Sequence, residues 1–275
     1  MATVLNGSIE LYYETFGNPS DPTIICIPGM GSQLLIYDEG FCLALVDRGF
    51  HTIRMDNRDS GLSSATVESD EYTLDDMADD VLAVLDDAEV EDVIVFGISL
   101  GGMVSQAFAI KYPTRTRALV SAMSATGEPD IGFGSAEVIE ALLLPDEATA
   151  EAQVEADLRV RKLWSNPDWY DEGPLRAYFI ACSERSRVVG GGGRQFAAVS
   201  RSEDRVEALR ALDVPTLVIH GESDTLITAE AGRRTAELIP GAEYLEIEEM
   251  SHDFVYQVWP TFVEAMTSLA ARTFS

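Results

Sequence analysis

The chain has 275 residues, of which 46% are hydrophobic, and its 47 acidic and 19 basic side chains give a net charge of −28. A chain of this length buries most of the surface that it exposes when unfolded, so its stability requires neither disulfides nor a structural metal. The negative charge repels phosphate backbones and anionic lipids, which excludes nucleic acid and membrane surfaces as partners.

The first residues, MATVLNGSIELYYE, alternate between polar and apolar side chains as a hairpin does. They lack the basic start and apolar block of a secretion signal, and no apolar run approaches the ~20 residues of a membrane helix. The three cysteines are widely spaced, which indicates neither a disulfide framework nor a zinc site. We therefore expect a cytoplasmic protein.

The acidic charge has two interpretations that both stay open. Lysine occurs only at Lys111 and Lys162, which indicates an arginine-rich coding bias. The first interpretation is therefore an ordinary solvated acidic surface in a chain with this bias. The other is adaptation to high salt, in which screening shortens the range of repulsion between like charges.

Between residues 23 and 123, short apolar runs alternate with helical stretches. Because the runs are short and rich in β-branched residues, they predict parallel strands of a sheet covered by helices on both faces. The clearest helix spans residues 73–88, where Thr73 and Asp76 form a capping-box-like pair. Aspartates cluster on this helix, and we interpret them as a solvated face rather than a metal site. The predicted strands cover residues 23–28, 51–56, 92–97 and 118–123.

The alternation of strands and helices stops near residue 126 and resumes near residue 206. Residues 127–205 lack clear strands and are helical in character, with five aromatic side chains from Trp164 to Phe179 and a glycine run at residues 190–193. Strands are predicted again at residues 215–221 and 242–248. We therefore predict an α/β core of residues 1–126 and 206–275 that is interrupted by a helical insertion, residues 127–205.

The segment Gly97-Ile98-Ser99-Leu100-Gly101 joins a predicted strand to a predicted helix. In a nucleophile elbow this turn holds its central residue in a strained conformation, and glycines on both sides avoid clashes. Ser99 would project above the sheet at a helix N-terminus, where the dipole favours developing negative charge. The motif predicts that Ser99 is a nucleophile; the alternative is an ordinary glycine-rich turn.

A serine hydroxyl becomes a good nucleophile only when a base takes its proton. Of the three histidines, His252 follows the last predicted strand, in a loop that can reach back over the sheet. His51 opens a strand and His220 ends one, so we expect both to be structural. The base is therefore predicted to be His252, in the manner of a Ser-His-Asp triad.

The base needs an acidic partner that fixes its tautomer. Asp224 lies in the loop after the strand of residues 215–221, and the chain order serine, aspartate, histidine is that of the elbow-containing hydrolases. We predict Asp224 as this acid, with Glu222 and Asp130 as the alternatives.

A glycine-rich turn, Pro28-Gly29-Met30-Gly31, follows the predicted strand of residues 23–28. Such a turn aims a main-chain N–H at the site, and the residue after the nucleophile supplies a second one. We predict an oxyanion hole made by the N–H groups of Met30 and Leu100; the alternative is a plain glycine turn.

These segments resemble the α/β-hydrolase fold family over nearly the whole chain, because GISLGG, HGESDTLI, EMSH and PGMG stand at the family's nucleophile, acid, base and oxyanion loop. DNRDSGLS, YTLDDMADD and SAMSATGEPDIG are similar to esterases and lactonases near the aclacinomycin methylesterases and acyl-homoserine-lactone lactonases. Pro28 departs from the family, many of whose members have histidine there. The resemblance implies an eight-stranded, mostly parallel α/β-hydrolase sheet with a helical cap inserted after the sixth strand, and no cofactor.

We expect a serine hydrolase, an esterase or lactonase that cleaves a medium-sized apolar small molecule through an acyl-enzyme. Gly29, Trp164 and Tyr178 are the expected substrate contacts, although the aromatic residues would equally suit a core within the cap. Residues 190–193 suit either the hinge of a lid or an idle loop. A perhydrolase or haloperoxidase-like activity, carbon–carbon bond hydrolysis on the same triad and a non-catalytic receptor are the alternatives, and a homodimer stays open.

Overall fold

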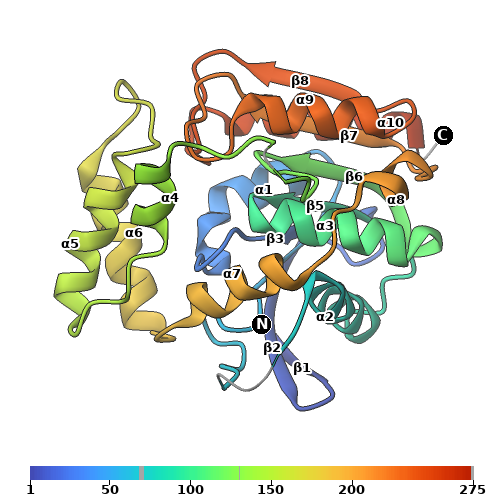
Figure 1. The fold of residues 1–275 in the computed structure, drawn as a ribbon. Coiled ribbons are helices and arrows are strands. Elements are labelled where there is room, and N and C mark those ends of the chain that lie inside the picture. Colours follow the sequence, from blue (N-terminus) through green and yellow to red (C-terminus); the bar gives the residue numbers. More distant parts are fainter. Residues whose placement is uncertain (68–70, 130, 274–275) are drawn as a thin grey trace.

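The computed structural model describes residues 1–67, 71–129 and 131–273. Its strands are β1 (Ala2–Asn6), β2 (Ile9–Phe16), β3 (Thr23–Ile27), β4 (His51–Met55), β5 (Val93–Ile98), β6 (Thr116–Ala122), β7 (Thr216–Gly221) and β8 (Glu243–Ile247). They form one sheet in the order β1-β2-β4-β3-β5-β6-β7-β8 (Figure 1). Strand β2 is antiparallel to β1 and β4, and the other pairs are parallel, which confirms the predicted eight-stranded, mostly parallel sheet.

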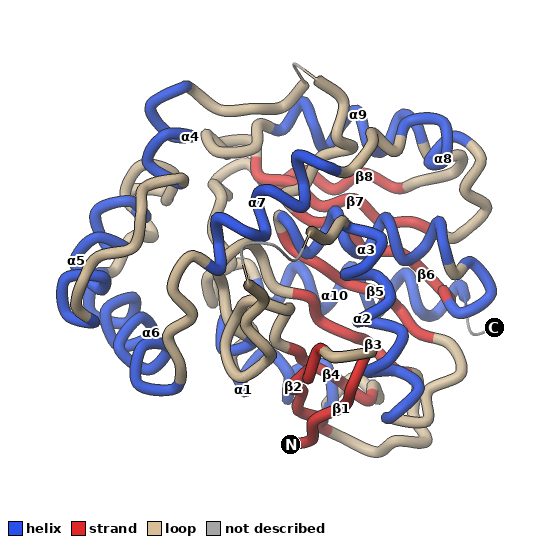
Figure 2. The backbone as a smooth tube through the Cα atoms, turned by 60° about the horizontal axis from the view of Figure 1, so that its bottom comes forward, coloured by secondary structure: helices blue, strands red, loops and turns tan. Residues whose placement is uncertain are grey.

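Helices cover both faces of this sheet (Figure 2). Those outside the insertion are α1 (Glu39–Val46), α2 (Leu74–Asp87), α3 (Leu100–Lys111), α8 (Val206–Arg210), α9 (Ala229–Leu238) and α10 (Trp259–Thr273), with 3-10 turns η1 (Leu34–Ile36) and η2 (Pro113–Arg115). Successive side chains of a strand point to opposite faces. Ile24 of β3 packs in the buried cluster that includes side chains of α1 and α10, whereas Ile25 packs in the cluster of α2, α3 and α9. Strands β3 and β5, at the centre of the sheet, are therefore buried along their whole length and almost entirely apolar.

Helix α2 begins as predicted but buries part of its acidic face. The N–H and the hydroxyl of Thr73 each donate to a carboxylate oxygen of Asp76 at 2.8 Å. The expectation of a fully solvated face is wrong at Asp80, which is 1% exposed and forms an ion pair with Arg58 at 2.5 Å. A buried carboxylate requires such a partner, so this residue joins α2 to the loop after β4.

The cap follows the sixth strand, as predicted, and consists of α4 (Ala136–Leu142), α5 (Ala150–Arg161), α6 (Glu172–Arg185) and α7 (Gly191–Arg201). In Figure 1, α4, α5 and α6 stand beside the core, whereas α7 crosses in front of it. Over the three described ranges, no helix has the length and apolar character needed to span a membrane. The domain boundaries after residues 126 and 205 stay a prediction.

The glycine run at residues 190–193 begins a helix, so the expectation of an idle loop is wrong. The role of the run as a hinge stays a prediction. Gly190 is the N-cap of α7 with a φ of +72°, and the following three glycines form the first turn of the helix. Glycine weakens a helix, but a Cβ at Gly191 would lie 2.1 Å from the main-chain oxygen of Asp59. Gly191 therefore lets α7 pack directly on the core.

Candidate active site

Ser99 lies at the turn between β5 and α3 in a strained main-chain conformation. Its φ of +55° and ψ of −121° are rare for a residue with a side chain and persist only where the surroundings enforce them. A Cβ at Gly97 would lie 2.0 Å from the main-chain oxygen of Gly101, and a Cβ at Gly101 would lie 1.9 Å from that of Ile27. Both glycines of the motif are thus required by close approach of the main chain.

Asp224 is held in the loop after β7 by main-chain donors. Its Oδ1 accepts hydrogen bonds from the N–H groups of Leu226 and Ile227, both at 2.9 Å, and its side chain is fully buried. Burial raises the pKa of this carboxyl, but the neighbouring imidazoles of His252 and His220 outweigh that effect and lower the pKa to about 2. The group is therefore a fixed carboxylate at neutral pH.

His252 lies in the loop after β8, and its Nδ1 is 2.7 Å from Oδ2 of Asp224. A carboxylate at Nδ1 places the proton there and leaves Nε2 free to accept one. His252 and Ser99 both line the same cavity, but no hydrogen bond between the two side chains occurs among the described residues. Such bonds are often long in ligand-free enzymes and tighten in the Michaelis complex.

The alternatives for the acid differ from Asp224 in their position. Glu222 is exposed to solvent, whereas Asp224 is buried. Asp130 lies outside the described residues. The structure therefore brings Asp224, and not Glu222, into contact with His252.

His220 lies next to Asp224, a contact that the sequence analysis did not predict. Its Nε2 lies 2.8 Å from the main-chain oxygen of Ile227 and 3.4 Å from Oδ2 of Asp224. Because a carbonyl oxygen only accepts, Nε2 carries the proton. A Cβ at Gly232 would lie 2.4 Å from Nδ1 of His220, so α9 packs directly on the imidazole. The spacing of four residues between His220 and Asp224 is the feature of the sequence that could have indicated this contact.

The two predicted oxyanion donors lie beside Ser99. Met30 and Leu100 both line the cavity, and within the described ranges neither main-chain N–H donates a hydrogen bond. A Cβ at Gly29 would lie 3.3 Å from the Cβ of Ser99 and 3.9 Å from its Oγ, so the loop passes next to the serine. Two free N–H groups next to a strained serine can bind a negatively charged oxygen.

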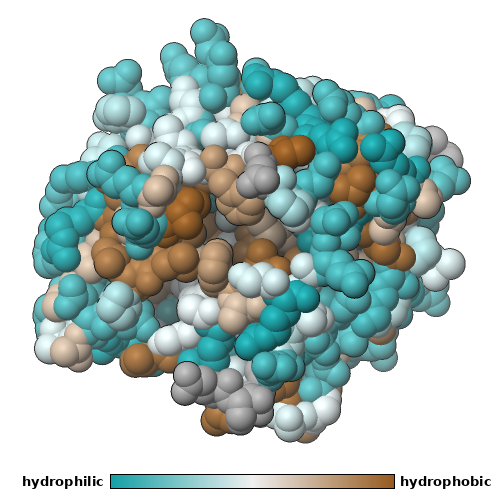
Figure 3. Space-filling view, in the orientation of Figure 1, coloured by the Kyte–Doolittle hydropathy of each residue, from teal (hydrophilic) through white to brown (hydrophobic). Residues whose placement is uncertain are grey.

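The site opens into a cavity of about 530 Å³ between the core and the cap. Figure 3 shows hydrophobic side chains gathered around the hollow. All three expected contacts, Gly29, Trp164 and Tyr178, lie on its wall, so the two aromatic residues face the cavity between cap and core. Much of the remaining wall is apolar, including Met103, Met123, Ile139, Leu142, Val154, Val160, Phe179, Phe196, Val199 and Leu226.

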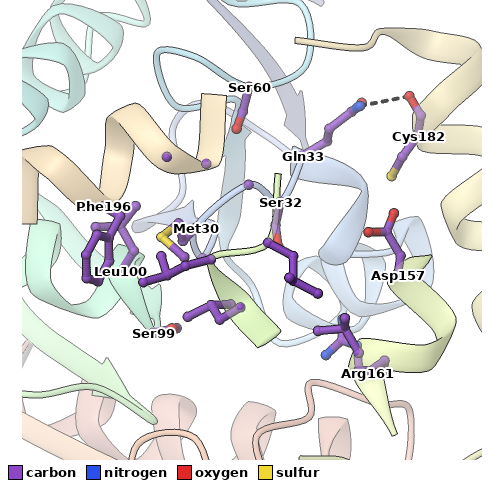
Figure 4. Close-up of a pocket in the computed structure, with 18 of the residues that line it drawn as sticks. Met30, Ser32, Gln33, Ser60, Ser99, Leu100, Asp157, Arg161, Cys182 and Phe196 are labelled. Atoms are coloured by element: carbon purple, nitrogen blue, oxygen red, sulfur yellow. Dashed lines mark hydrogen bonds between the residues drawn. The ribbon is translucent and has the colours of Figure 1, made fainter. Parts of the chain in front are cut away.

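Charged side chains of α5 also line this cavity, and sequence reasoning missed them. Burial raises the pKa of Asp157, whose Oδ1 accepts a hydrogen bond from Gln153 at 2.8 Å. Asp157 and Arg161 are four residues apart and share one helix face. In Figure 4 they lie on the side of the cavity opposite Met30 and Ser99. The cavity wall is thus largely apolar on the cap as well as on the core, and α5 adds two charged side chains to it.

The loop of His252 is tied to the cap by several hydrogen bonds. The N–H of His252 donates to the main-chain oxygen of Trp164 at 3.1 Å. The carboxylate of Asp253 accepts from the hydroxyl of Ser165 at 2.8 Å and from the N–H of Asn166 at 3.0 Å. The position of His252 therefore depends on the segment that follows α5.

Comparison with known proteins agrees with this geometry. A family model described as alpha/beta hydrolase fold matches residues 22–257. The chain is 26% identical to 3-oxoadipate enol-lactonase 2 of Acinetobacter baylyi, with 91% of this chain and 89% of that protein aligned. It is 28% identical to rhodomycin D methylesterase DnrP of Streptomyces peucetius, with 90% and 91% aligned. The solved enol-lactonase of Burkholderia xenovorans LB400 superposes with a TM-score of 0.77 at 22% identity, over 98% of this chain and all of that one.

Proposed function

Since the chain belongs to the α/β-hydrolase fold family, we propose that it is a serine hydrolase that cleaves ester or lactone bonds. The observation that carries this proposal is the 2.7 Å contact between His252 and Asp224 on the cavity that also holds the strained Ser99. These are the parts that acyl transfer requires, and they occur in the chain order of the family.

In this mechanism the hydroxyl of Ser99 attacks the carbonyl carbon while Nε2 of His252 takes its proton. Asp224 holds the other ring nitrogen and stabilises the imidazolium that forms. The N–H groups of Met30 and Leu100 bind the developing oxyanion. His252 then protonates the leaving alcohol, and a water molecule repeats the cycle to release the acid.

The proposed substrate is a medium-sized, largely apolar ester or lactone. A volume of about 530 Å³ lies within the range of small-molecule sites, and much of the wall is hydrophobic. The relatives support this class, since one is named as an enol-lactonase and another as a methylesterase. The cytoplasmic location and the homodimer remain predictions from the sequence.

A panel of p-nitrophenyl esters and lactones, measured on the wild type and on Ser99→Ala, tests the proposal. We expect turnover with an acyl-enzyme burst in the wild type and none in Ser99→Ala. Ser200→Ala, which changes an exposed serine of α7, is the matched control and should behave as the wild type. Turnover that survives in Ser99→Ala would refute the proposal. Saturable binding without turnover would indicate a receptor, and peracid formation exceeding hydrolysis in acetate and peroxide would indicate a perhydrolase.

A further inference from the structure

The loop that carries the Met30 N–H is held on both sides by side chains from outside the loop. Nδ2 of Asn57 donates to the main-chain oxygen of Pro28 at 2.9 Å and fixes the peptide that follows Pro28. Oε1 of Gln195 accepts from the N–H of Gly31 at 2.8 Å and fixes the peptide that precedes Gly31. The peptide between these two bears the Met30 N–H, so its direction is set from both ends.

Gln195 belongs to the cap, and both ends of its side-chain amide form hydrogen bonds with residues of the core. It is completely buried, and its Nε2 donates to the main-chain oxygen of Arg58 at 2.7 Å and to the hydroxyl of Ser60 at 3.1 Å. A carbonyl oxygen only accepts and an N–H only donates, so only one orientation of the amide fits these partners. The side chain is therefore a fixed support for the N–H of Gly31.

Helix α7, which carries Gln195, is itself anchored to the core at both ends. At its start, Gly191 packs against the main chain of Asp59, and the guanidinium of Arg194 forms an ion pair with the buried carboxylate of Asp59 at 2.8 Å. At its end, the hydroxyl of Ser202 accepts from the N–H of Leu74 at 2.9 Å. The anchored helix therefore fixes the position of Gln195 and, through its bond to Gly31, the position of the loop.

We propose that Gln195 is a positioning residue of the oxyanion hole, so that the cap helps to build the catalytic machinery as well as the substrate pocket. Proline at position 28 has neither an N–H nor a polar side chain, so the residue before Gly29 offers no donor that could hold the loop. The side chains of Asn57 and Gln195 supply that support. The inference rests on the proposed function, because it gives the Met30 N–H the role of oxyanion donor.

Removing this support should lower kcat. An oxyanion donor binds the oxygen more strongly in the transition state than in the ground state, so a misplaced donor slows the chemistry and leaves substrate binding nearly unchanged. Loss of one such donor costs roughly 100- to 1,000-fold. Because Gln195 acts through the loop, we expect Gln195→Met to lower kcat by roughly 10- to 100-fold and to change KM less than about threefold.

The test measures kcat and KM with a p-nitrophenyl ester, and the inhibition constant of phenylboronic acid, which forms a tetrahedral adduct with the serine. For Gln195→Met, the inhibition constant should rise by about the factor by which kcat/KM falls, while Ser200→Ala on the same helix retains wild-type values. A folded Gln195→Met protein with kcat and boronate affinity within about twofold of the wild type would overturn the inference, as would a loss confined to KM.

Gln195→Glu keeps the proposal testable if the methionine variant does not fold. A protonated glutamic acid can accept from the N–H of Gly31 and donate to the main-chain oxygen of Arg58. A carboxylate has no proton to donate, so it would be repelled by that oxygen. The ratio of the kcat of Gln195→Glu to that of the wild type should therefore rise severalfold from about pH 8 to about pH 5.5, and taking this ratio removes the pH effects that both enzymes share. A flat ratio would overturn the inference. Turnover that survives in Ser99→Ala would instead refute the proposed function, whatever Gln195 does.

Discussion

The substitution Asp253→Asn tests how firmly the cap is attached to the loop of the proposed base. Asp253 is 2% exposed, and its two oxygens separately accept from Ser165 and from the N–H of Asn166. The guanidinium of Arg161 lies 3.5 Å away. Asparagine has nearly the same shape, but its amide accepts on only one side. With Oδ1 turned toward the N–H of Asn166, the amide nitrogen faces the Ser165 hydroxyl, which must then accept instead of donate, and it also faces the guanidinium of Arg161.

The free-energy cost follows from these contacts. Replacing hydrogen bonds to a charged group by neutral ones, and placing an amide N–H group beside the guanidinium of Arg161, each cost about 1–3 kcal/mol. Burial raises the pKa of Asp253 despite the nearby guanidinium of Arg161, so removing the charge recovers part of the loss. We expect a net destabilisation of about 2–4 kcal/mol, which corresponds to a fall in Tm of roughly 5–15 °C for a chain of this size.

Thermal unfolding at neutral pH measures this effect, with kcat measured in parallel. Asp168→Asn is the matched control, since Asp168 is an exposed aspartate near the same segment of the cap. Its Tm should stay close to that of the wild type. If Asp253→Asn melts within about 1 °C of the wild type, the bonds to Ser165 and Asn166 do not secure the cap, and the reasoning is refuted.

Three further predictions follow from charge and packing. The pKa of Asp224 is about 2 in the folded protein and about 3.9 in an unfolded chain; its stabilising contribution is therefore complete above about pH 5 and lost as the pH falls through about 2. In urea unfolding, the stability difference between the wild type and Asp224→Asn should shrink over that window, and a constant difference would contradict the assignment. If the net charge of −28 reflects adaptation to salt, Tm should rise between low and molar salt as screening increases; a Tm that does not rise would favour the ordinary acidic surface. Gly101→Ala should cost more than about 4 kcal/mol or prevent folding, because its Cβ would lie 1.9 Å from the main-chain oxygen of Ile27. Gly193→Ala, whose Cβ would meet nothing within 4 Å among the described residues, should be neutral or stabilising by up to about 1 kcal/mol, and equal effects of the two substitutions on Tm would contradict the packing argument.

The parts of the site that local geometry dictates could be predicted from the sequence. A turn between a strand and a helix leaves no room for side chains beside the serine, so the glycines around Ser99 are visible in the chain itself. The positions of Asp224 and His252 after neighbouring strands β7 and β8 of a parallel sheet bring them to one edge. Their contact at 2.7 Å follows from this order of strands.

The contacts between cap and core could not be predicted, because they depend on how helices dock. The bond between Gly31 and Gln195 joins residues 164 positions apart, and no periodicity reports such a pair. Low helix propensity made residues 190–193 resemble a loop, yet the closeness of the Asp59 main chain requires glycine at position 191. Likewise, Asp80 looks solvated until Arg58 is placed beside it.

Covalent labelling tests the central claim most directly. A fluorophosphonate reacts with an activated serine, and mass spectrometry of the digested protein locates the modified residue. We predict a single adduct on Ser99, formed much more slowly in His252→Ala and absent in Ser99→Ala. Labelling of a different residue, or unchanged labelling of Ser99 in His252→Ala, would contradict the account.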